Sequence, residues 1–249
     1  MRIGLIGAGN MARALARGWQ EPVLAADPVA SRAQALVDEL GGEVVATNAE
    51  LAQRADAVLL CHKPGQLDQV AAEVAPHARA VVSILGGTPL AALRAAYPST
   101  PVVRMLPSVP VEVRQGVTCH ARDPEADDDL QKAVLGLFAR VGPVVTVDEP
   151  LLDAAMGLMS CAPAYLALVC EAQVDAGVRA GLTAEVAGDL VVGTLAGTAA
   201  LLRHHDLDTL AVRRSVTSPG GSTARGLAAL ERHGLRTAFD DALQAVMAR

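Results

Sequence analysis

Residues 2–12 read RIGLIGAGNMA and decide the fold of the first half of the chain. An apolar strand is predicted up to the first glycine of the pattern, and helical spacing then continues to Trp19. Between the two lies the pattern GxGxxA. Gly7 permits a tight turn, Gly9 lets the backbone approach a pyrophosphate, and Ala12 lets the helix lie close to the strand. The stretch therefore predicts the first strand, turn and helix of a dinucleotide-binding fold.

A second apolar stretch, Pro22 to Ala26, is followed by Asp27, about 20 residues after the glycines, as this fold requires. A carboxylate there accepts hydrogen bonds from the adenosine ribose and favours NADH over NADPH. Arg32 follows one helical turn later and could pair with a 2′-phosphate, so both cofactors stay open. Asp27 could instead cap the helix that starts near Pro28. The cofactor residues expected in this half begin with Gly7, Gly9, Asn10, Met11 and Asp27.

Further strands are predicted at 57–62, 80–85, 101–106 and 143–147, with helical stretches between them. This alternation predicts an α/β fold with a Rossmann-type, doubly wound parallel sheet. Ligands of such sheets lie at the carboxyl ends of the strands. Three segments fall at these ends, 61–64, 83–87 and 104–110, and the first and third add the expected cofactor residues Lys63, Pro64, Met105 and Pro107. His62 and Arg104 lie beside them. A structural role is expected for His62, and Arg104 could equally be a surface charge or a loop anchor.

From Glu149 onward the strand signals stop and apolar residues recur at helical spacing. We therefore expect a dinucleotide-binding domain over 1–148 and an all-α domain over 149–249. The stretch from Ala184 to Leu202 is apolar nearly all round, but Glu185, Asp189 and its glycines leave it short of a membrane span. A second copy of the chain is expected to cover it, which predicts an obligate homodimer.

Composition excludes several other classes of function. A net charge of -6 and scattered basic residues argue against a nucleic-acid partner. The four cysteines form no CxxC pair and have no zinc-like spacing with histidine, so buried reduced thiols and no metal site are expected. The chain begins on a strand-like run without a charged leader, which predicts a cytoplasmic protein without a membrane anchor.

A second motif, Ser218-Pro219-Gly220-Gly221-Ser222-Thr223, precedes a predicted helix far from the nucleotide motif. The first amides of a helix have no intrahelical partners, and the helix dipole is positive there. Such a loop can bind a carboxylate without any arginine. Taken alone, the motif is more typical of a capped turn before a surface helix.

The chain resembles the pyrroline-5-carboxylate reductase family over nearly its whole length. The matching segments are GxGxxA, Lys63-Pro64, 104–110, 163–165, 171–172, 175–178, 181–182 and, most specifically, Ser218-Pro219-Gly220-Gly221. The resemblance implies a Rossmann domain and a dimerisation domain whose helices interleave between subunits. It also implies that NADPH or NADH reduces a cyclic imine, pyrroline-5-carboxylate, to proline.

The resemblance further implies roles for the residues of the second motif. Thr223 matches a hydroxyl that hydrogen-bonds the imine nitrogen. The amides of Gly220, Gly221, Ser222 and Thr223 are expected to hold the substrate carboxylate, with Ser218 and Pro163 also contacting substrate. An iminium already carries the positive charge that attracts hydride, so no further catalytic acid is required.

The sequence departs from the family pattern at Met156, Ser108, Val109 and the segment Met159 to Ala162. Two alternatives follow: reduction of a different cyclic imine, or a non-catalytic nucleotide-binding dimer. A β-hydroxyacid dehydrogenase would need a lysine in the helical half, and none follows Lys132. Whether dimers associate further is left open by the sequence.

Overall fold

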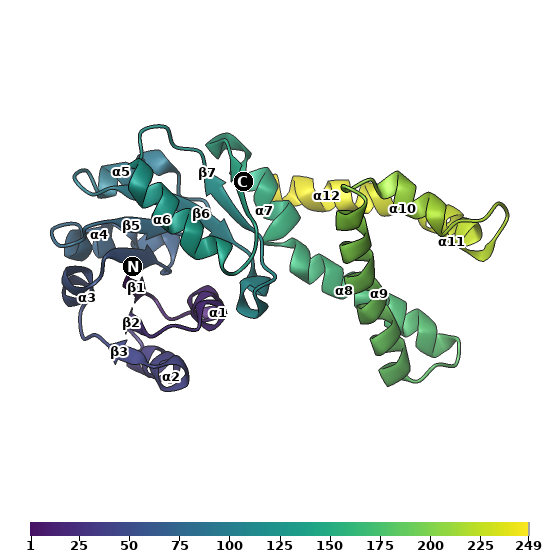
Figure 1. Ribbon diagram of the computed structural model, residues 1–249, viewed down its shortest axis with the longest axis horizontal. Coiled ribbons are helices and arrows are strands. Elements are labelled where there is room, and N and C mark those ends of the chain that lie inside the picture. Colours follow the sequence, from purple (N-terminus) through teal and green to yellow (C-terminus); the bar gives the residue numbers. More distant parts are fainter. Residues whose placement is uncertain (249) are drawn as a thin grey trace. The chain divides into compact units, whose positions relative to one another are not determined.

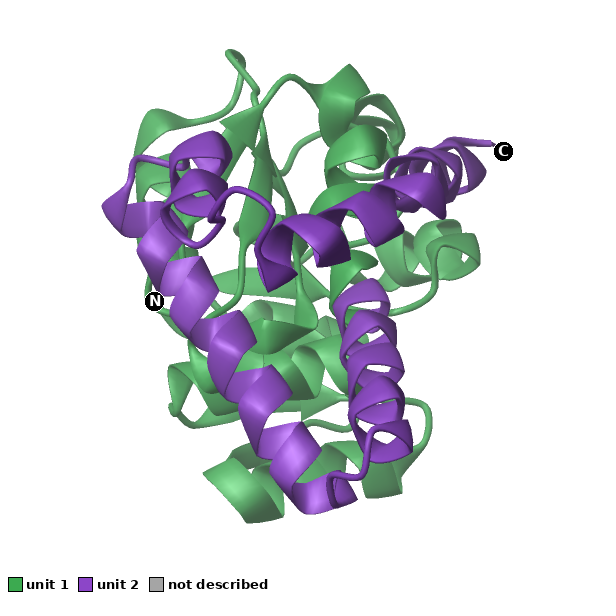
Figure 2. Ribbon diagram, turned by 90° about the vertical axis from the view of Figure 1, so that its right-hand side faces the viewer, with its two compact units in different colours: residues 1–163 green, residues 164–249 purple. Residues whose placement is uncertain are grey.

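The structure is a computed structural model that describes residues 1–248. Contacts divide the chain into two compact units, residues 1–163 and the part from Ala164 onward (Figures 1 and 2). Residues 149–163, which the sequence pattern assigns to the helical half, belong by their contacts to the first unit.

The first unit contains one eight-stranded sheet in the order β3-β2-β1-β4-β5-β6-β7-β8. The strands are β1 Ile3–Ile6, β2 Val23–Ala26, β3 Gly42–Val44, β4 Ala57–Leu60, β5 Val81–Ser83, β6 Val102–Pro107, β7 Thr118–Ala121 and β8 Val144–Val147. All neighbours run parallel except β6 and β7, which are antiparallel. The predicted Rossmann-type sheet is confirmed, and β3 and β7 are additions to it.

Helices cover both faces of this sheet. The helices of the first unit are α1 Asn10–Trp19, α2 Ala30–Leu40, α3 Asn48–Arg54, α4 Leu67–Val74, α5 Leu90–Ala96, α6 Asp128–Ala139 and α7 Leu152–Met159, with 3₁₀ turns η1 Pro64–Gln66, η2 Val109–Val113 and η3 Glu149–Leu151. One apolar cluster joins α1, α2 and α6 to the sheet, and a second joins α3, α4 and α5 to its other face. The central strands are therefore buried on both sides, which explains their continuous apolar runs.

Trp19 fixes α1 against α6 on the first of these faces. Its side chain is 3% exposed, and its indole N–H donates to the carbonyl of Leu137 at 3.1 Å. Its ring meets that of Phe138 edge to face, with centroids 5.6 Å apart. This is the preferred arrangement of two aromatic quadrupoles. The contact holds the helix that follows the glycine-rich turn in place.

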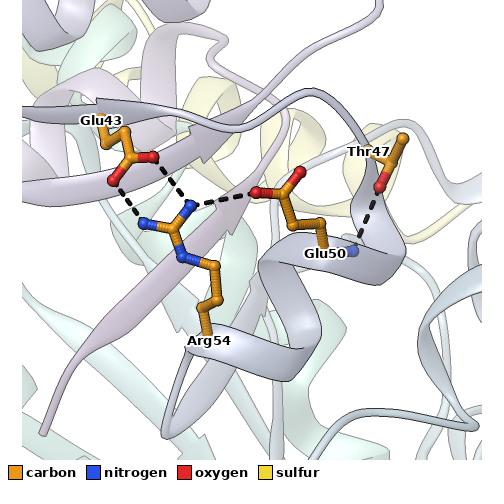
Figure 3. A network of polar contacts seen from close by, with 4 residues as sticks. All are labelled: Glu43, Thr47, Glu50 and Arg54. Carbon is orange, nitrogen blue, oxygen red and sulfur yellow. Dashed lines mark hydrogen bonds and ion pairs between the residues drawn. The ribbon is translucent and has the colours of Figure 1, made fainter.

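A polar network ties α3 to the edge strand β3 (Figure 3). The Arg54 guanidinium donates to both Glu43 and Glu50 of this surface, and the Glu50 amide donates to the Thr47 hydroxyl at 3.1 Å. The guanidinium holds the pKa of the Glu43 carboxyl below its usual range. Because these groups are largely in water, the network holds α3 beside β3 more than it stabilises the fold.

Burial of His120 on β7 makes the first unit sensitive to acid. The side chain is 3% exposed, and its Nδ1 lies 3.2 Å from the Thr146 hydroxyl. Burial lowers the pKa of His120, an effect opposed by nearby Asp123 and reinforced by Arg122. The unfolded chain therefore binds a proton below about pH 6.5 that the folded chain does not.

Stability should accordingly be complete above pH 6.5 and fall as the pH drops below it. The limiting slope from one histidine is about 1.4 kcal/mol per pH unit. Urea unfolding between pH 5 and 8 checks this, with His120→Gln expected to flatten the acid limb. The exposed His205, changed in the same way, is the control. Equal slopes for wild type and His120→Gln would contradict the assignment.

The second unit is entirely helical in its described part. Its helices are α8 Ala162–Arg179, whose first two residues belong to the first unit, α9 Ala184–His204, α10 Thr209–Ser215, α11 Ser222–Arg232 and α12 Leu235–Met247. Side chains cap two of them: the Thr183 hydroxyl accepts from Val186 N, and the Asp208 carboxylate accepts from Leu210 N and Ala211 N.

Apolar side chains of the second unit are widely exposed within the single chain. Only Ala187 of α9 is buried in the described structure, whereas Leu190 is 57% and Val192 60% exposed. Two stretches, Glu149–Arg179 and Ala184–His204, are apolar and long enough to cross a membrane by length and composition alone. The expectation that the second stretch falls short of a membrane span is therefore wrong on these two criteria. The first stretch is interrupted at Ser160 and Cys161, between α7 and α8.

Candidate functional site

A cavity of about 590 Å³ opens over the glycine-rich turn at the carboxyl ends of β1, β2, β4 and β5. This is the edge at which the strand order of the sheet predicts a ligand. Seven of the predicted cofactor residues line it: Gly7, Gly9, Asn10, Met11, Asp27, Lys63 and Pro64. The lining also includes residues outside the predicted set, among them Arg13, His62, Gln66 and the segment 84–86. His62 and the segment 84–86 follow the carboxyl ends of β4 and β5, a place that sequence can indicate, whereas Arg13 lies in α1 and Gln66 in η1.

The two glycines of the turn serve different purposes. Gly7 has a φ of +97°, and an added Cβ would lie 2.9 Å from the backbone of Cys61. Its amide donates to the carbonyl of Ala26 at 2.8 Å, which joins the turn to β2. Gly9 is the N-cap of α1 with an ordinary φ of −76°, and an added Cβ there meets no protein atom within 4 Å. The fold thus requires glycine at Gly7, whereas at Gly9 an added Cβ would extend into the open cavity without touching the described protein.

Alanine at these two positions should separate stability from cofactor binding. Gly7→Ala is expected to cost roughly 1 to 3 kcal/mol of folding free energy, because its backbone conformation is strained for any other residue. Gly9→Ala should leave the melting temperature nearly unchanged and weaken NADH binding by about tenfold or more, since its Cβ would occupy the pyrophosphate's approach. Thermal unfolding and cofactor titration of both variants check this. Equal melting temperatures for the two variants would contradict it.

Asp27 lies at the end of β2 and binds two backbone amides at once. Its Oδ2 accepts from Ala8 N and its Oδ1 from Val29 N, each at 2.8 Å. The second bond is local, to the amide two residues ahead, and the N-cap of α2 is Val29 rather than Asp27. The first joins the carboxylate to the glycine-rich turn. The helix-cap alternative for Asp27 is therefore wrong, whereas its side chain lines the cavity, and its contact with cofactor stays a prediction.

The segment after β4 presents Lys63 to the cavity and holds its own backbone by local bonds. The His62 ring Nδ1 lies 2.8 Å from the Lys63 carbonyl and so carries the hydrogen, while Lys63 N donates to Gln66 Oε1 at 3.2 Å. Burial lowers the pKa of His62, which favours the neutral ring. Although Cys61 is partly exposed as a residue, desolvation by the surrounding protein raises the pKa of its thiol and disfavours the thiolate near neutral pH.

The expectation of four buried cysteines is wrong for three of them. Cys119 is buried, whereas Cys61, Cys161 and Cys170 are partly exposed. Cys161 and Cys170 lie just before and within α8, where much of the apolar surface is uncovered in the single chain. Sequence alone gave no signal for which helix faces would be exposed.

Two other predicted cofactor residues, Met105 and Pro107, lie on β6 and do not line the described cavity. Met105 is 1% exposed and packs in the core, and the Pro107 carbonyl accepts a hydrogen bond from the Ser160 hydroxyl at 2.9 Å. Their contact with cofactor stays a prediction.

Arg104 is a loop anchor, one of the two roles its sequence context allowed. It is 6% exposed, and its guanidinium contacts Glu149 Oε1 at 2.5 Å. The same oxygen accepts from Leu90 N at 2.6 Å. Ser108, a departure from the family pattern, also has a structural partner, since its hydroxyl bridges the N–H and carbonyl of Val117.

In the second unit, Ser218 to Gly221 form a tight turn before α11. Pro219 occupies its second position, Gly220 follows with a φ of +68°, and the Gly221 amide donates to the Ser218 carbonyl at 3.0 Å. These are the features of a type II turn. Arg225 braces it by donating to the Gly220 carbonyl at 2.8 Å and to the Ser222 hydroxyl at 3.3 Å. The turn therefore has a defined conformation in the chain alone.

This turn leaves only some of the predicted donors free for a carboxylate. Gly221 N is occupied by the turn, whereas Ser222 and Thr223 are the first two residues of α11 and are exposed. Amides at these positions have no intrahelical acceptor. Pro163, also predicted to contact substrate, is half-buried near the start of α8. Arg225 was not predicted, because nothing in the spacing indicated that it folds back onto the turn.

Family models match both parts of the chain. A model described as pyrroline-5-carboxylate reductase dimerisation matches residues 149–249, and one described as NADP oxidoreductase coenzyme F420-dependent matches residues 2–87. A pyrroline-5-carboxylate reductase of Synechocystis is 34% identical and that of Thermus thermophilus 36%; each alignment covers 100% of this chain and 97% of the relative.

Solved structures agree. The pyrroline carboxylate reductase of Plasmodium falciparum, solved with NADP bound, matches with a TM-score of 0.89 at 26% identity, over 99% of this chain and 95% of that one. The pyrroline-5-carboxylate reductase of Coxiella burnetii matches with a TM-score of 0.88 at 28% identity, over 98% and 95%. The cavity over the glycine-rich turn and the turn before α11 thus occur in a chain that belongs to the pyrroline-5-carboxylate reductase family.

Proposed function

We propose that this protein is an NAD(P)H-dependent oxidoreductase that reduces 1-pyrroline-5-carboxylate to L-proline. The observation that carries the proposal is that one chain combines a cavity over Gly7 and Gly9 with a defined glycine-containing turn before α11, features that suit a dinucleotide and a carboxylate. Identity of about one third to relatives of that name over the full chain supports the same reaction.

The cofactor site fits a dinucleotide by its backbone and its charges. The turn from Gly7 to Gly9 and the start of α1 offer amides and a positive helix end to the pyrophosphate. Lys63 and Arg13 line the same cavity and add positive charge. Asp27 offers acceptors for ribose hydroxyls at its far end. The bound reduced nicotinamide supplies the hydride.

The substrate turn fits a small carboxylate that carries a nearby imine. We assign the carboxylate to the free amides of Ser222 and Thr223 and to the positive end of α11. The side-chain hydroxyl of Thr223 is then close to the bound carboxylate and can accept a hydrogen bond from the protonated ring nitrogen. Arg225 keeps the turn in its binding conformation through Gly220. Holding the ring in one orientation toward the hydride donor is the main catalytic task of these residues.

We further propose that the helices from α8 onward form the contact with a second copy of the chain. Exposed apolar side chains on α9 leave that surface in water in the single chain, and a symmetric dimer would bury it. The name of the family model over 149–249 supports this use. Under this proposal the long apolar helices are dimer helices of a cytoplasmic enzyme rather than membrane spans.

The oxidation of NADH and of NADPH, followed at 340 nm with 1-pyrroline-5-carboxylate and then with other cyclic imines, tests the proposed reaction. Turnover with the first substrate is the expected result. Turnover only with a different imine would support the proposed mechanism but not the proposed substrate. The departures at Met159 to Ala162 would then be the first positions to examine. Cofactor binding without turnover on any imine would favour a non-catalytic nucleotide-binding dimer.

A further inference from the structure

We propose that the cofactor site prefers NADH to NADPH, and that the Asp27 carboxylate sets this preference. The inference rests on the proposed function only in assigning the cavity over Gly7 and Gly9 to a nicotinamide dinucleotide. It matters because a solved relative binds NADP. The preference of this chain therefore cannot be taken from its family and must come from its own residues.

The position of the Asp27 carboxylate is fixed by two bonds. Each of its oxygens accepts a backbone amide at 2.8 Å, one from Ala8 in the glycine-rich turn and one from Val29 ahead of α2. Turning the side chain away from the cavity would break both bonds and leave two amides unpaired. A 2′-phosphate at this end of β2 would consequently meet a negative charge that has no alternative position.

The hollow that adjoins the main cavity at Asp27 adds negative charge, and its described lining contains no positive charge. This second hollow, of about 260 Å³, shares Gly7, Asp27, Pro28, His62 and Gln66 with the main cavity. Its described lining contains Glu73 and no lysine or arginine. The Asn48 amide donates to Glu73 Oε2 at 2.9 Å, which keeps that carboxylate in place. Neutral ribose hydroxyls suit this region, and a phosphate dianion does not.

Arg32 is the group that could offset this charge. It lines the main cavity from the first turn of α2, and its side chain is exposed. An exposed arginine can approach a 2′-phosphate, but it cannot displace the carboxylate that Ala8 and Val29 hold. We therefore expect a preference for NADH of about tenfold or more, moderated by solvent screening in an open cavity.

The test is a titration of the purified protein with NADH and, separately, with NADPH, followed by nicotinamide fluorescence and calorimetry without any imine. Asp27→Asn and Asp27→Ser remove the charge and are expected to move the ratio of the two Kd values toward NADPH by about tenfold or more. Arg32→Ala is expected to weaken NADPH and leave NADH within about twofold, because no 2′-phosphate is present in NADH.

Asp56→Asn is the matched control. The Asp56 carboxylate also accepts a backbone amide, that of Arg2, at 2.7 Å, but it directly precedes β4 and so lies at the opposite edge of the sheet. Removing its charge should leave the ratio of Kd values unchanged. A similar change of the ratio in Asp56→Asn and Asp27→Asn would overturn the assignment to Asp27.

The outcomes separate this inference from the proposed function. Tighter binding of NADPH by the wild type would overturn the NADH preference and leave the reductase proposal standing. An unchanged ratio in both Asp27 variants would overturn the role of the carboxylate. Binding of neither cofactor would overturn the assignment of the cavity itself, and with it the proposed function. Preferred binding of NADH without imine turnover would support the inference while the proposed reaction failed.

Discussion

Replacing Thr223 with alanine is expected to lower kcat for 1-pyrroline-5-carboxylate by about 10- to 100-fold. The hydroxyl is proposed to orient the ring nitrogen, and its removal costs less than the 100- to 1000-fold typical of a donor at a full developing charge. The Kd for NADH should change by less than about twofold, because the residue lies at the start of α11 and is proposed to contact substrate only. Steady-state kinetics and cofactor titration of the same preparation check both numbers.

Thr217→Ala is the matched control for this substitution. The Thr217 hydroxyl lies just before the turn and donates to the carbonyl of Arg213 at 2.5 Å, so it has a structural partner within its own chain. If removal of the Thr217 hydroxyl breaks only this surface hydrogen bond, the variant should keep kcat within about twofold of the wild type. Similar losses in both variants would point to general loosening of the turn. Loss of NADH binding in Thr223→Ala would contradict the assignment of Thr223 to substrate.

Replacing Leu190 with lysine is expected to dissociate the dimer and abolish most activity. Leu190 lies in α9 and is 57% exposed in the single chain. Burying a leucine side chain stabilises an interface by about 1.5 to 3 kcal/mol, and a twofold axis applies each substitution twice. An unpaired buried charge adds a further penalty. Analytical ultracentrifugation against protein concentration, with activity measured on the same samples, tests this.

Val145→Lys is the control for the dimer prediction. Val145 lies on β8, the outer strand of the sheet, and is 46% exposed. Lysine is well tolerated on edge strands, so the sedimentation coefficient and kcat should stay those of the wild type. A dimeric Leu190→Lys protein with full activity would contradict the proposed use of α9. Ultracentrifugation of the wild type also shows whether dimers associate further.

The sheet and the cofactor cavity were largely predictable from sequence because their signals are local. A glycine pattern after an apolar strand specifies the turn at Gly7, and continuous apolar runs specify strands buried on both faces. The strands that were missed lack such runs. β3 is three residues on an exposed edge, and β7 carries Thr118 and His120 in a short, buried but polar sequence.

The hydrogen-bond and ion-pair partners of individual polar groups could not be predicted from the sequence. The two amide bonds of Asp27 depend on the distance between a turn and a helix start, which no spacing rule fixes. The same holds for Gly221, whose amide was expected to bind substrate and instead closes the turn onto Ser218. Arg104 offered two interpretations until its pairing with Glu149 was visible. Such choices follow from tertiary geometry rather than from pattern.

The most direct test of the account is the fate of the hydride. The protein should be incubated with 1-pyrroline-5-carboxylate and NADH that carries deuterium at both C4 positions, and the product analysed by mass spectrometry and NMR. The account predicts proline with one deuterium on the ring carbon of the former C=N bond. The account would be contradicted if the protein is folded and binds the cofactor but the incubation yields no deuterated proline.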